Sequence, residues 1–186
     1  MKLLKMVKDF LAEKKQDTYE FGCVMLYFSF PEINKIHDAI NPQDLYEEEE
    51  DSTYGLEDEP HTTLLYGIHA GIPLEVIEGI VDRYTFSKCN IGNASLFTND
   101  KYDVLKFDVT GKNLHECNSA LRELPHTSTF PDYHPHLTIG YLKPGMGKKY
   151  VEIMKRLTFT LIPQYGVYSM PTGEKEKFSI HIENQD

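Results

Sequence analysis

Residues 60–66 read "PHTTLLY", and residues 135–141 read "PHLTIGY". Proline, histidine, threonine and tyrosine occupy the first, second, fourth and seventh positions of both blocks, and an aliphatic residue follows the threonine at the fourth position. Because proline is tolerated at the first residue of a strand, each block is predicted to be a strand that begins there. The rest of the chain contains no comparable repeat, which indicates two similar halves that each contribute one such strand.

Each predicted strand places a histidine and a threonine on the same face. Side chains two residues apart point to the same side of a sheet, so His61 shares a face with Thr63, and His136 with Thr138. Packing the halves about a rough two-fold axis would bring both faces together across a central cleft. The intervening residues are predicted to pack on the opposite face: Thr62, Leu64 and Tyr66 in the first strand, and Leu137, Ile139 and Tyr141 in the second.

The remaining segments alternate between runs typical of strands and runs with apolar residues at helical spacing. The predicted fold class is α+β, with two mostly antiparallel sheet lobes related by pseudo-two-fold symmetry around the cleft, and helices outside. Strands are predicted at residues 22–30, 158–170 and 177–184, and a hairpin at residues 85–111. Helices are predicted at residues 31–40, 71–84, 151–157 and 113–124, the last with Asn113 as its N-cap, and turns or loops at residues 41–60 and 143–150.

Residues 1–20 are predicted to form an amphipathic helix that extends a single domain spanning residues 1–186. Apolar side chains recur there at helical spacing among lysines and acids, which differs from the apolar core of a signal peptide. No segment has the long apolar run of a membrane helix, and the three cysteines are too scattered for a disulfide framework. We therefore expect a cytoplasmic protein with reduced thiols and no membrane partner.

Acidic residues outnumber basic ones, 29 to 19, which gives a formal net charge of −10. Proteins that track long nucleic acids carry a basic surface, and this sequence has no strongly basic block. We therefore expect no long nucleic acid as a partner. A small phosphate-containing ligand, held by a few directed groups, fits the composition.

Two imidazoles and two hydroxyls that converge on one small volume can perform acid–base chemistry. The ordinary pKa of histidine is about 6.5, so near neutral pH one imidazole can accept a proton while the other donates one. The threonine hydroxyls can donate hydrogen bonds to phosphoryl oxygens on which charge develops. This set suits in-line attack at phosphorus without a metal or other cofactor, with a ribose 2′-OH as the nucleophile. Either His61 or His136 could be the base.

A metal site is the weaker hypothesis for the second block. His134 and His136 lie two residues apart, which is a plausible spacing for two metal ligands. No acidic or cysteine side chain accompanies them at supportive spacing. We therefore expect His134 to border the cleft or to help orient the ligand, and Lys143, just past the strand, is a further candidate for contact with a phosphate.

With its paired His-x-Thr blocks, the chain resembles the 2H phosphoesterase superfamily. The resemblance implies a bilobal fold, a metal-independent phosphodiesterase activity, and a catalytic tetrad consisting of His61, Thr63, His136 and Thr138. The stretches "GLEDEPHTTLLYGIH", "YDVLKFDV" and "YHPHLTIGYLKPG" are most similar to one branch, the phage proteins that degrade the cyclic di- and trinucleotide signals of bacterial CBASS immunity.

That branch implies cleavage of 3′-5′ bonds in messengers such as 3′3′-cGAMP, next to a free 2′-OH, in the cytoplasm of the bacterial host. It also implies that an aromatic side chain stacks on a nucleobase, for which Tyr27, Phe97 and Tyr133 are the candidates. Two alternatives stay open. One is another 2H activity, on RNA 2′,3′-cyclic phosphates or 2′-5′ oligoadenylate, and the other is a non-catalytic sponge that binds nucleotides in the same cleft.

Overall fold

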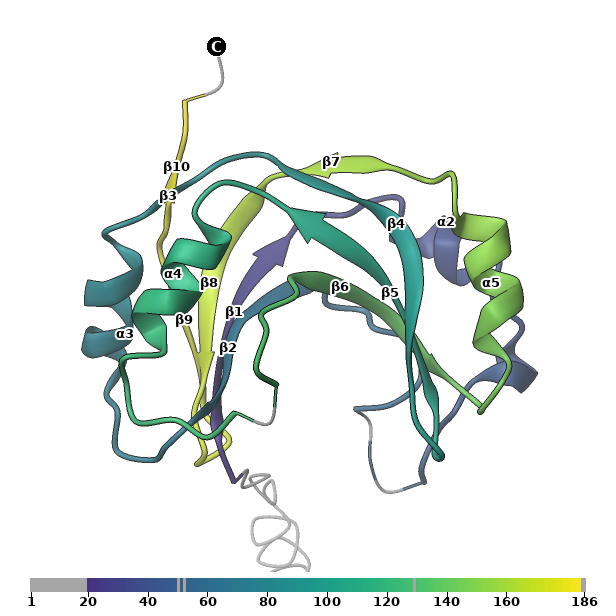
Figure 1. The fold of residues 1–186 in the computed structure, drawn as a ribbon, viewed down its shortest axis with the longest axis horizontal. Helices are drawn as coiled ribbons and strands as arrows, with labels where there is room; N and C mark the ends of the chain where they lie inside the picture. Colours follow the sequence, from purple (N-terminus) through teal and green to yellow (C-terminus); the bar gives the residue numbers. More distant parts are fainter. Residues whose placement is uncertain (1–19, 50, 52, 129, 185–186) are drawn as a thin grey trace, which may run out of the picture.

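The computed structural model describes residues 20–49, 51, 53–128 and 130–184. The helix predicted for residues 1–20 therefore lies outside the described residues, apart from Glu20. Eight strands form one curled antiparallel sheet (Figure 1) with the order β7 (Phe159–Leu161), β4 (Cys89–Thr98), β5 (Asp103–Thr110), β6 (His136–Leu142), β2 (His61–Ile68), β1 (Gly22–Phe28), β8 (Pro163–Ser169) and β9 (Lys175–Phe178). A separate parallel pair consists of β3 (Thr85–Phe86) and β10 (His181–Ile182).

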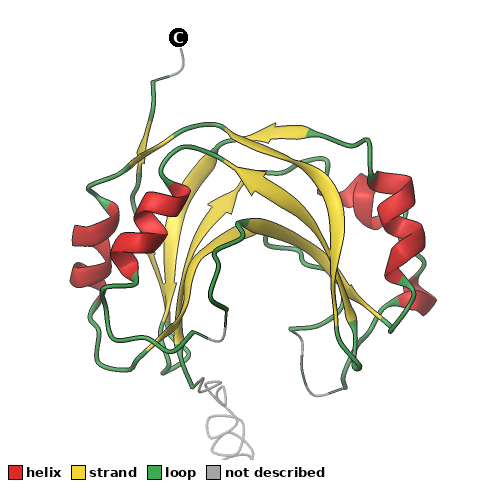
Figure 2. Ribbon diagram, in the orientation of Figure 1, coloured by secondary structure: helices red, strands yellow, loops and turns green. Residues whose placement is uncertain are grey.

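The helices lie in two groups at opposite ends of the curled sheet (Figure 2). On the side of β2, α3 (Leu74–Val81) packs against α4 (Leu114–Leu121), which contacts β2. On the side of β6, α2 (Ile33–His37) contacts β6, and α5 (Gly147–Met154) contacts β4 and β5. A single turn of 3₁₀ helix, Pro42–Asp44, follows α2. The predicted α+β fold with a mostly antiparallel sheet and outer helices is confirmed.

The two predicted lobes are the two halves of one continuous sheet. From the centre outward, one half runs β2-β1-β8-β9 and the other runs β6-β5-β4-β7. The halves meet where β2 pairs with β6, in an antiparallel register that sets Thr62 opposite Leu137. These are the middle residues of the two His-x-Thr motifs. An antiparallel pair has a local two-fold axis at its midpoint, so this residue pair is the centre of the pseudo-symmetry.

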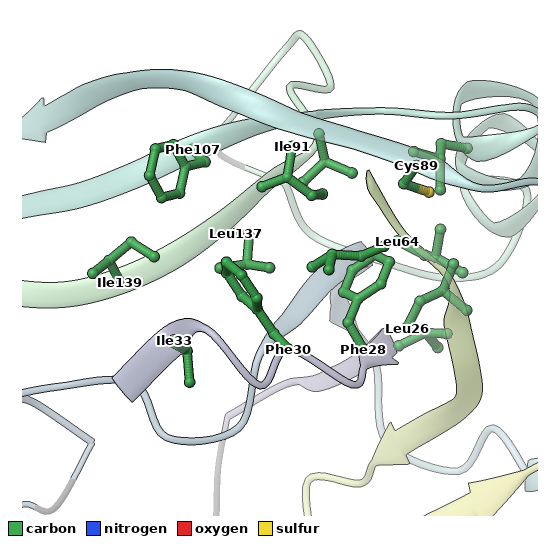
Figure 3. Packing of buried hydrophobic residues seen from close by; sticks show 14 of the residues in the cluster. Leu26, Phe28, Phe30, Ile33, Leu64, Cys89, Ile91, Phe107, Leu137 and Ile139 are labelled. Carbon is green, nitrogen blue, oxygen red and sulfur yellow. The ribbon is translucent and has the colours of Figure 1, made fainter. Parts of the chain in front are cut away.

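The main hydrophobic core lies on the helix-covered face of the sheet and runs through both halves without a break. Figure 3 shows Leu26 and Leu64 of one half packed in the same cluster as Phe107 and Ile139 of the other. Each large apolar side chain that is fully buried contributes about 1.5–3 kcal/mol relative to leaving it exposed. The shared core therefore holds the two halves together, whereas the direct pairing of β2 with β6 is short.

Both repeat strands contain a β-bulge directly after the His-x-Thr motif. The register of β2 with β1 skips Leu64, and the register of β6 with β5 skips Ile139. An extra residue reverses the alternation of every side chain that follows it. The prediction that Tyr66 and Tyr141 pack on the opposite face is therefore wrong. Tyr66 is 56% exposed, and Tyr141 lies opposite Val104 on the same face as the histidines.

Of two predictions about helix ends, one is confirmed in position and the other is wrong. Asn113 is the N-cap of α4, and its carbonyl accepts from the Cys117 amide, but its backbone is left-handed (φ 65°) and its side-chain amide donates to the carbonyl of Thr85 instead of making a capping bond. α5 begins at Gly147, inside the segment predicted to be a turn. The amides of Gly145 and Gly147 each donate to Asp103 Oδ2 at 3.0 Å. This distant carboxylate satisfies backbone donors that a helix start leaves without partners.

The hydroxyl of Thr62 provides a test of packing at the centre of the sheet. Its Oγ1 atom is buried and has no hydrogen-bond partner among the described residues. A buried polar group without a partner costs on the order of 1–3 kcal/mol, so the near-isosteric Thr62→Val should raise the free energy of unfolding by about 1 kcal/mol. Chemical denaturation measures this change. The exposed control Thr98→Val should change it by less than about 0.5 kcal/mol, and a destabilised Thr62→Val would contradict the packing described.

Candidate active site

The four residues of the predicted tetrad lie together at the centre of the sheet, on the face that none of the described helices covers, hereafter the open face. Extending the β2–β6 register by one residue each way sets His61 opposite Thr138, and Thr63 opposite His136. Each histidine thus has the threonine of the other motif as its neighbour across the strands. The two histidines stand on a diagonal, where Cα atoms are roughly 7–8 Å apart in antiparallel pairs. This spacing leaves room for a phosphoryl group between the imidazoles.

Both histidines are held by the same backbone contact. His61 Nδ1 lies 2.7 Å from the carbonyl oxygen of Glu59, and His136 Nδ1 lies 2.8 Å from the carbonyl oxygen of His134. A carbonyl can only accept, so Nδ1 carries the proton in both rings. In the neutral form the remaining lone pair is then on Nε2, and this atom is the one left to exchange protons with a ligand.

A lysine and a carboxylate flank the second motif. In the register of β5 with β6, Asp108 lies opposite His136, and Lys106 lies opposite Thr138. Lys106 Nζ donates to Asp108 Oδ1 and to Ser95 Oγ, each 2.9 Å away. The Lys106 side chain is 7% exposed. Because a buried charge is poorly screened by solvent and salt, its field acts on the groups beside it.

The surroundings of His136 favour its neutral form. Burial is the largest cause of the lowered pKa of this imidazole. The positive charges of Lys106 and His61 act in the same direction. The hydrogen bond to the His134 carbonyl and the charge of Asp108 oppose the shift without cancelling it. At neutral pH His136 therefore offers its Nε2 lone pair to a proton donor.

His61 has aromatic neighbours in place of the charged pair. Tyr27 lies opposite it in the register of β1 with β2, and the two rings stack with their centroids 5.3 Å apart. Tyr165 stacks on Tyr27 in turn, at 5.4 Å, and Lys177 Nζ lies 3.4 Å from the centre of the Tyr165 ring. The backbone of the two halves is therefore similar at the site, whereas the chemistry beside each histidine differs.

The structure places the other sequence-derived candidates at different distances from the tetrad. Tyr27 and Phe97 are beside it: the Phe97 ring meets His136 edge-on at 5.0 Å, lies 4.5 Å from Lys106 Nζ, and is 43% exposed. His134 is exposed and contributes its carbonyl oxygen to the site. Phe97 and His134 are thus exposed beside the tetrad, whereas Tyr27 is buried with its ring stacked on both His61 and Tyr165.

Tyr133 and Lys143 are engaged elsewhere. The Tyr133 hydroxyl donates to the carbonyl oxygen of Thr63 at 2.9 Å, and its ring packs edge-on against His115 of α4. It supports β2 from within the scaffold. Lys143 Nζ donates to the carbonyl oxygen of Gln43 at 2.7 Å, which ties the end of β6 to the 3₁₀ turn.

Lys106 and Asp108 flank the second motif and Asn93 donates to Asp108, but none of the three was predicted from the sequence. Burial opposes ionisation of Asp108, but the hydrogen bonds from Lys106 and Asn93 outweigh it and lower the pKa of the carboxyl group. A signal was present in "YDVLKFDV", because Lys106 and Asp108 are two residues apart in a predicted strand and therefore share one face. The neighbouring strand could not be identified without the register.

Among the described residues, no group of three or more histidine, cysteine, aspartate or glutamate side chains is placed to hold a metal ion. The three cysteines are free, with Cys89 and Cys117 buried and Cys23 half-buried. Burial raises the pKa of the Cys117 thiol to about 12. In the part of the chain that the structure describes, no helix is both long and apolar enough to cross a membrane.

Comparison with known proteins finds a similar fold among solved structures. No protein-family model matches the sequence, and no curated protein is significantly similar to it. The structure is similar to that of Kluyveromyces marxianus Usb1, with a TM-score of 0.56 and 11% identity over 87% of this chain and 99% of the Usb1 chain. It is also similar to the structure of the same protein with uridine monophosphate, with a TM-score of 0.51 and 10% identity over 87% of this chain and 98% of that one. At this level of identity the likeness concerns the fold.

The field of Lys106 at His136 can be measured without a substrate. Lys106→Met keeps the length of the side chain and removes a charge that lowers the pKa of His136. We expect the wild-type His136 ring to titrate below the ordinary histidine value of 6.5, and its pKa to rise in the variant. Two-dimensional NMR of the imidazole protons as a function of pH reads both values. The control Lys177→Met, on the Tyr165 side, should leave the His136 titration in place, and an equal shift in both variants would refute the local effect.

Proposed function

We propose that this protein is a metal-independent phosphodiesterase that cleaves 3′-5′ bonds in small cyclic oligonucleotides. The observation that carries the proposal is the pairing of two His-x-Thr motifs across the β2–β6 register, with both imidazoles anchored through Nδ1. The arrangement gives one phosphoryl group a proton acceptor on one side and a proton donor on the other. A protein that only bound nucleotides would have no use for two imidazoles held in the same tautomer.

The proposed reaction is an in-line displacement at phosphorus. The basic imidazole takes the proton of a ribose 2′-OH, and the 2′ oxygen forms a bond to the adjacent phosphorus. The bond from phosphorus to the 5′ oxygen breaks, and the acidic imidazole donates its proton to that leaving oxygen. The products are a 2′,3′-cyclic phosphate and a free 5′-hydroxyl, so a cyclic substrate becomes linear. The Thr63 and Thr138 hydroxyls donate to the phosphoryl oxygens as charge develops on them.

The asymmetry of the site supports one assignment of the two roles. His136 is the base in this proposal, because its buried position beside Lys106 favours the neutral imidazole. His61 is then the acid that protonates the leaving 5′ oxygen. Lys106 acts as a positioning residue: its charge supports the neutral form of His136 and attracts the phosphate toward Thr138, the residue opposite it on β6.

Several observations support a small nucleotide as the substrate. The fold is shared with Usb1, one of whose structures holds uridine monophosphate. The formal net charge of −10 disfavours long nucleic acids, which bind by displacing counterions from a basic surface. The flanking stretches of both motifs resemble the phage proteins that degrade cyclic messengers, so we propose 3′3′-cGAMP and related rings as substrates and evasion of CBASS immunity as the role.

One assay separates this proposal from its rivals. The purified full chain is incubated with 3′3′-cGAMP, 2′,3′-cyclic AMP and 2′-5′ oligoadenylate in the presence of EDTA, and the products are resolved by chromatography. We expect turnover of the first substrate alone. Turnover of either of the others instead would point to RNA ends or to 2′-5′ bonds, tight binding without products would identify a sponge, and loss of activity in EDTA would contradict the metal-free mechanism.

Substitution of either histidine tests the two-imidazole mechanism. His61→Ala and His136→Ala should each lower kcat by at least about 100-fold, since general acid or base catalysis contributes roughly 10²–10⁴ in rate. The matched control is His181→Ala, in β10, whose ring is 63% exposed and interacts with Asp82. It should keep full activity. A comparable loss in the control, or near-normal activity in either site variant, would rule the mechanism out.

The pH profile tests the assignment of His136 as the base. As the pH falls through the pKa of the base, the imidazole gains a proton and kcat/KM must fall. Because the pKa of His136 is lowered, the midpoint of this acidic limb should lie below pH 6.5 and coincide with the NMR titration of His136 in the free protein. An acidic limb that instead follows the titration of His61 would reverse the two roles.

A further inference from the structure

We propose that a cavity beside His136 is the subsite for the nucleobase of the nucleoside that supplies the attacking 2′-OH, and that it selects bases with an exocyclic amino group. The inference rests on the proposed function for the identity of the nucleoside, but the cavity itself is independent of it. Its volume is about 530 Å³, within the usual range for small-molecule sites. Its polar lining comes from β4, β5, β7 and the residue before β7: Asn90, Asn93, Asp108, Thr110, Thr158 and Thr160.

The sheet register places this cavity next to the tetrad on the open face. Asp108 lines the cavity and also lies opposite His136 on the neighbouring strand. Asn90 lies opposite Thr110 on β5 and opposite Thr160 on β7, so these three exposed side chains share the face of Asp108. With strands about 4.8 Å apart, β4 is about 10 Å from β6. A nucleoside joined to a phosphate at His136 can span that distance.

The chemistry of the lining disfavours a phosphate and favours a neutral planar group. Among the described residues that line the cavity there is no lysine, arginine or histidine that could hold an anion, and the charge of Asp108 is paired with Lys106. The apolar side chains of the lining point away from the cavity, into the hydrophobic core. Ile91 is 1% exposed, and the Phe159 ring packs edge-on against Phe30 at 4.8 Å in the core. What faces the cavity is a set of amides, hydroxyls and one carboxylate.

Those groups match the hydrogen-bonding edge of a base. Asparagine pairs with an adenine edge through a donor and an acceptor on one planar group, and a carboxylate accepts from the amino group of cytosine. Asn93 occupies a left-handed backbone conformation (φ 55°) at a bulge between Gly92 and Ser95, and its Nδ2 donates to Asp108. The bulge thus holds the Asn93 amide against Asp108, with Nδ2 as the donor, and Asn93 Oδ1 remains as an acceptor in the lining. An exocyclic amino group can donate to this oxygen, whereas the carbonyl at the same position in uracil cannot.

A binding experiment on the full chain tests the subsite. Adenosine 3′-monophosphate, uridine 3′-monophosphate and ribose 5-phosphate are titrated by calorimetry at pH 7. We expect adenosine 3′-monophosphate to bind at least about tenfold more tightly than either of the others, because a site built to hydrogen-bond a polar group rejects ligands that lack it. Equal affinity for all three, tighter binding of the uridine nucleotide, or no binding of any of them overturns the proposal.

Two variants locate the effect. Asn90→Ala and Thr160→Val should each weaken the binding of adenosine 3′-monophosphate by about tenfold and leave the affinity for ribose 5-phosphate unchanged. Thr160→Val preserves the β-branched shape of the side chain, so it still tests the subsite if Asn90→Ala disturbs folding. Asn34→Ala, on the exposed surface of α2, is the control and should have no effect. Equal weakening of both ligands, or no weakening in either variant, would overturn the assignment. Base-selective binding without turnover of 3′3′-cGAMP would leave the subsite standing and refute the proposed activity alone.

Discussion

The antiparallel contact between β2 and β6 is the constraint on which the rest of the structure depends. Its register places Thr62 against Leu137, and the arrangement of the four tetrad residues follows from that residue pair. The side chains on either side of it must point the other way, so both histidines and both threonines emerge on one face. A slip of either strand by one residue would send its histidine and threonine into the core. The fully buried side chains of Thr62 and Leu137 oppose such a slip, because it would expose apolar surface and bury imidazoles.

Symmetry of the backbone is combined here with asymmetry of the side chains. Both repeat strands begin after a proline, hold the histidine by a backbone carbonyl, and carry a bulge after the threonine. Their outer neighbours differ. β5 brings Lys106 and Asp108 to one motif, whereas β1 brings Tyr27 to the other. Two imidazoles in the same tautomer therefore experience different fields, and an acid and a base can be distinguished without any difference in their anchoring.

The sequence predicted the parts of the molecule that local pattern controls. The repeat identified the two central strands, and helical spacing identified the apolar faces of α3 and α4. The failures share a cause, which is that the deciding contact is distant in the chain. The Asp103 carboxylate, which lies on β5, accepts from the first backbone amide of α5. The side-chain amide of Asn113 donates to the Thr85 carbonyl instead of making a capping bond to α4. The bulges at Leu64 and Ile139 leave no mark in composition, and they reversed the predicted positions of both tyrosines. Lys106 and Asp108 were visible as a polar pair on one strand face, but only the pairing of β5 with β6 shows which histidine they serve.

The division of the open face into a symmetric centre and asymmetric flanks matches what a phosphodiester requires. The attacking and leaving oxygens lie on opposite sides of the phosphorus atom, so two equivalent imidazoles can serve them. The two nucleosides that it joins are not equivalent, because one supplies the 2′-OH and the other carries the leaving 5′ oxygen. A site with identical flanks would accept the diester in both directions, and half of the encounters would set the base against the wrong oxygen. Under the proposed function, the amide-lined cavity beside His136 and the stacked tyrosines beside His61 would remove that degeneracy. The duplicated motif would then perform the chemistry, and the differences between its surroundings would determine the direction in which the bond is cut.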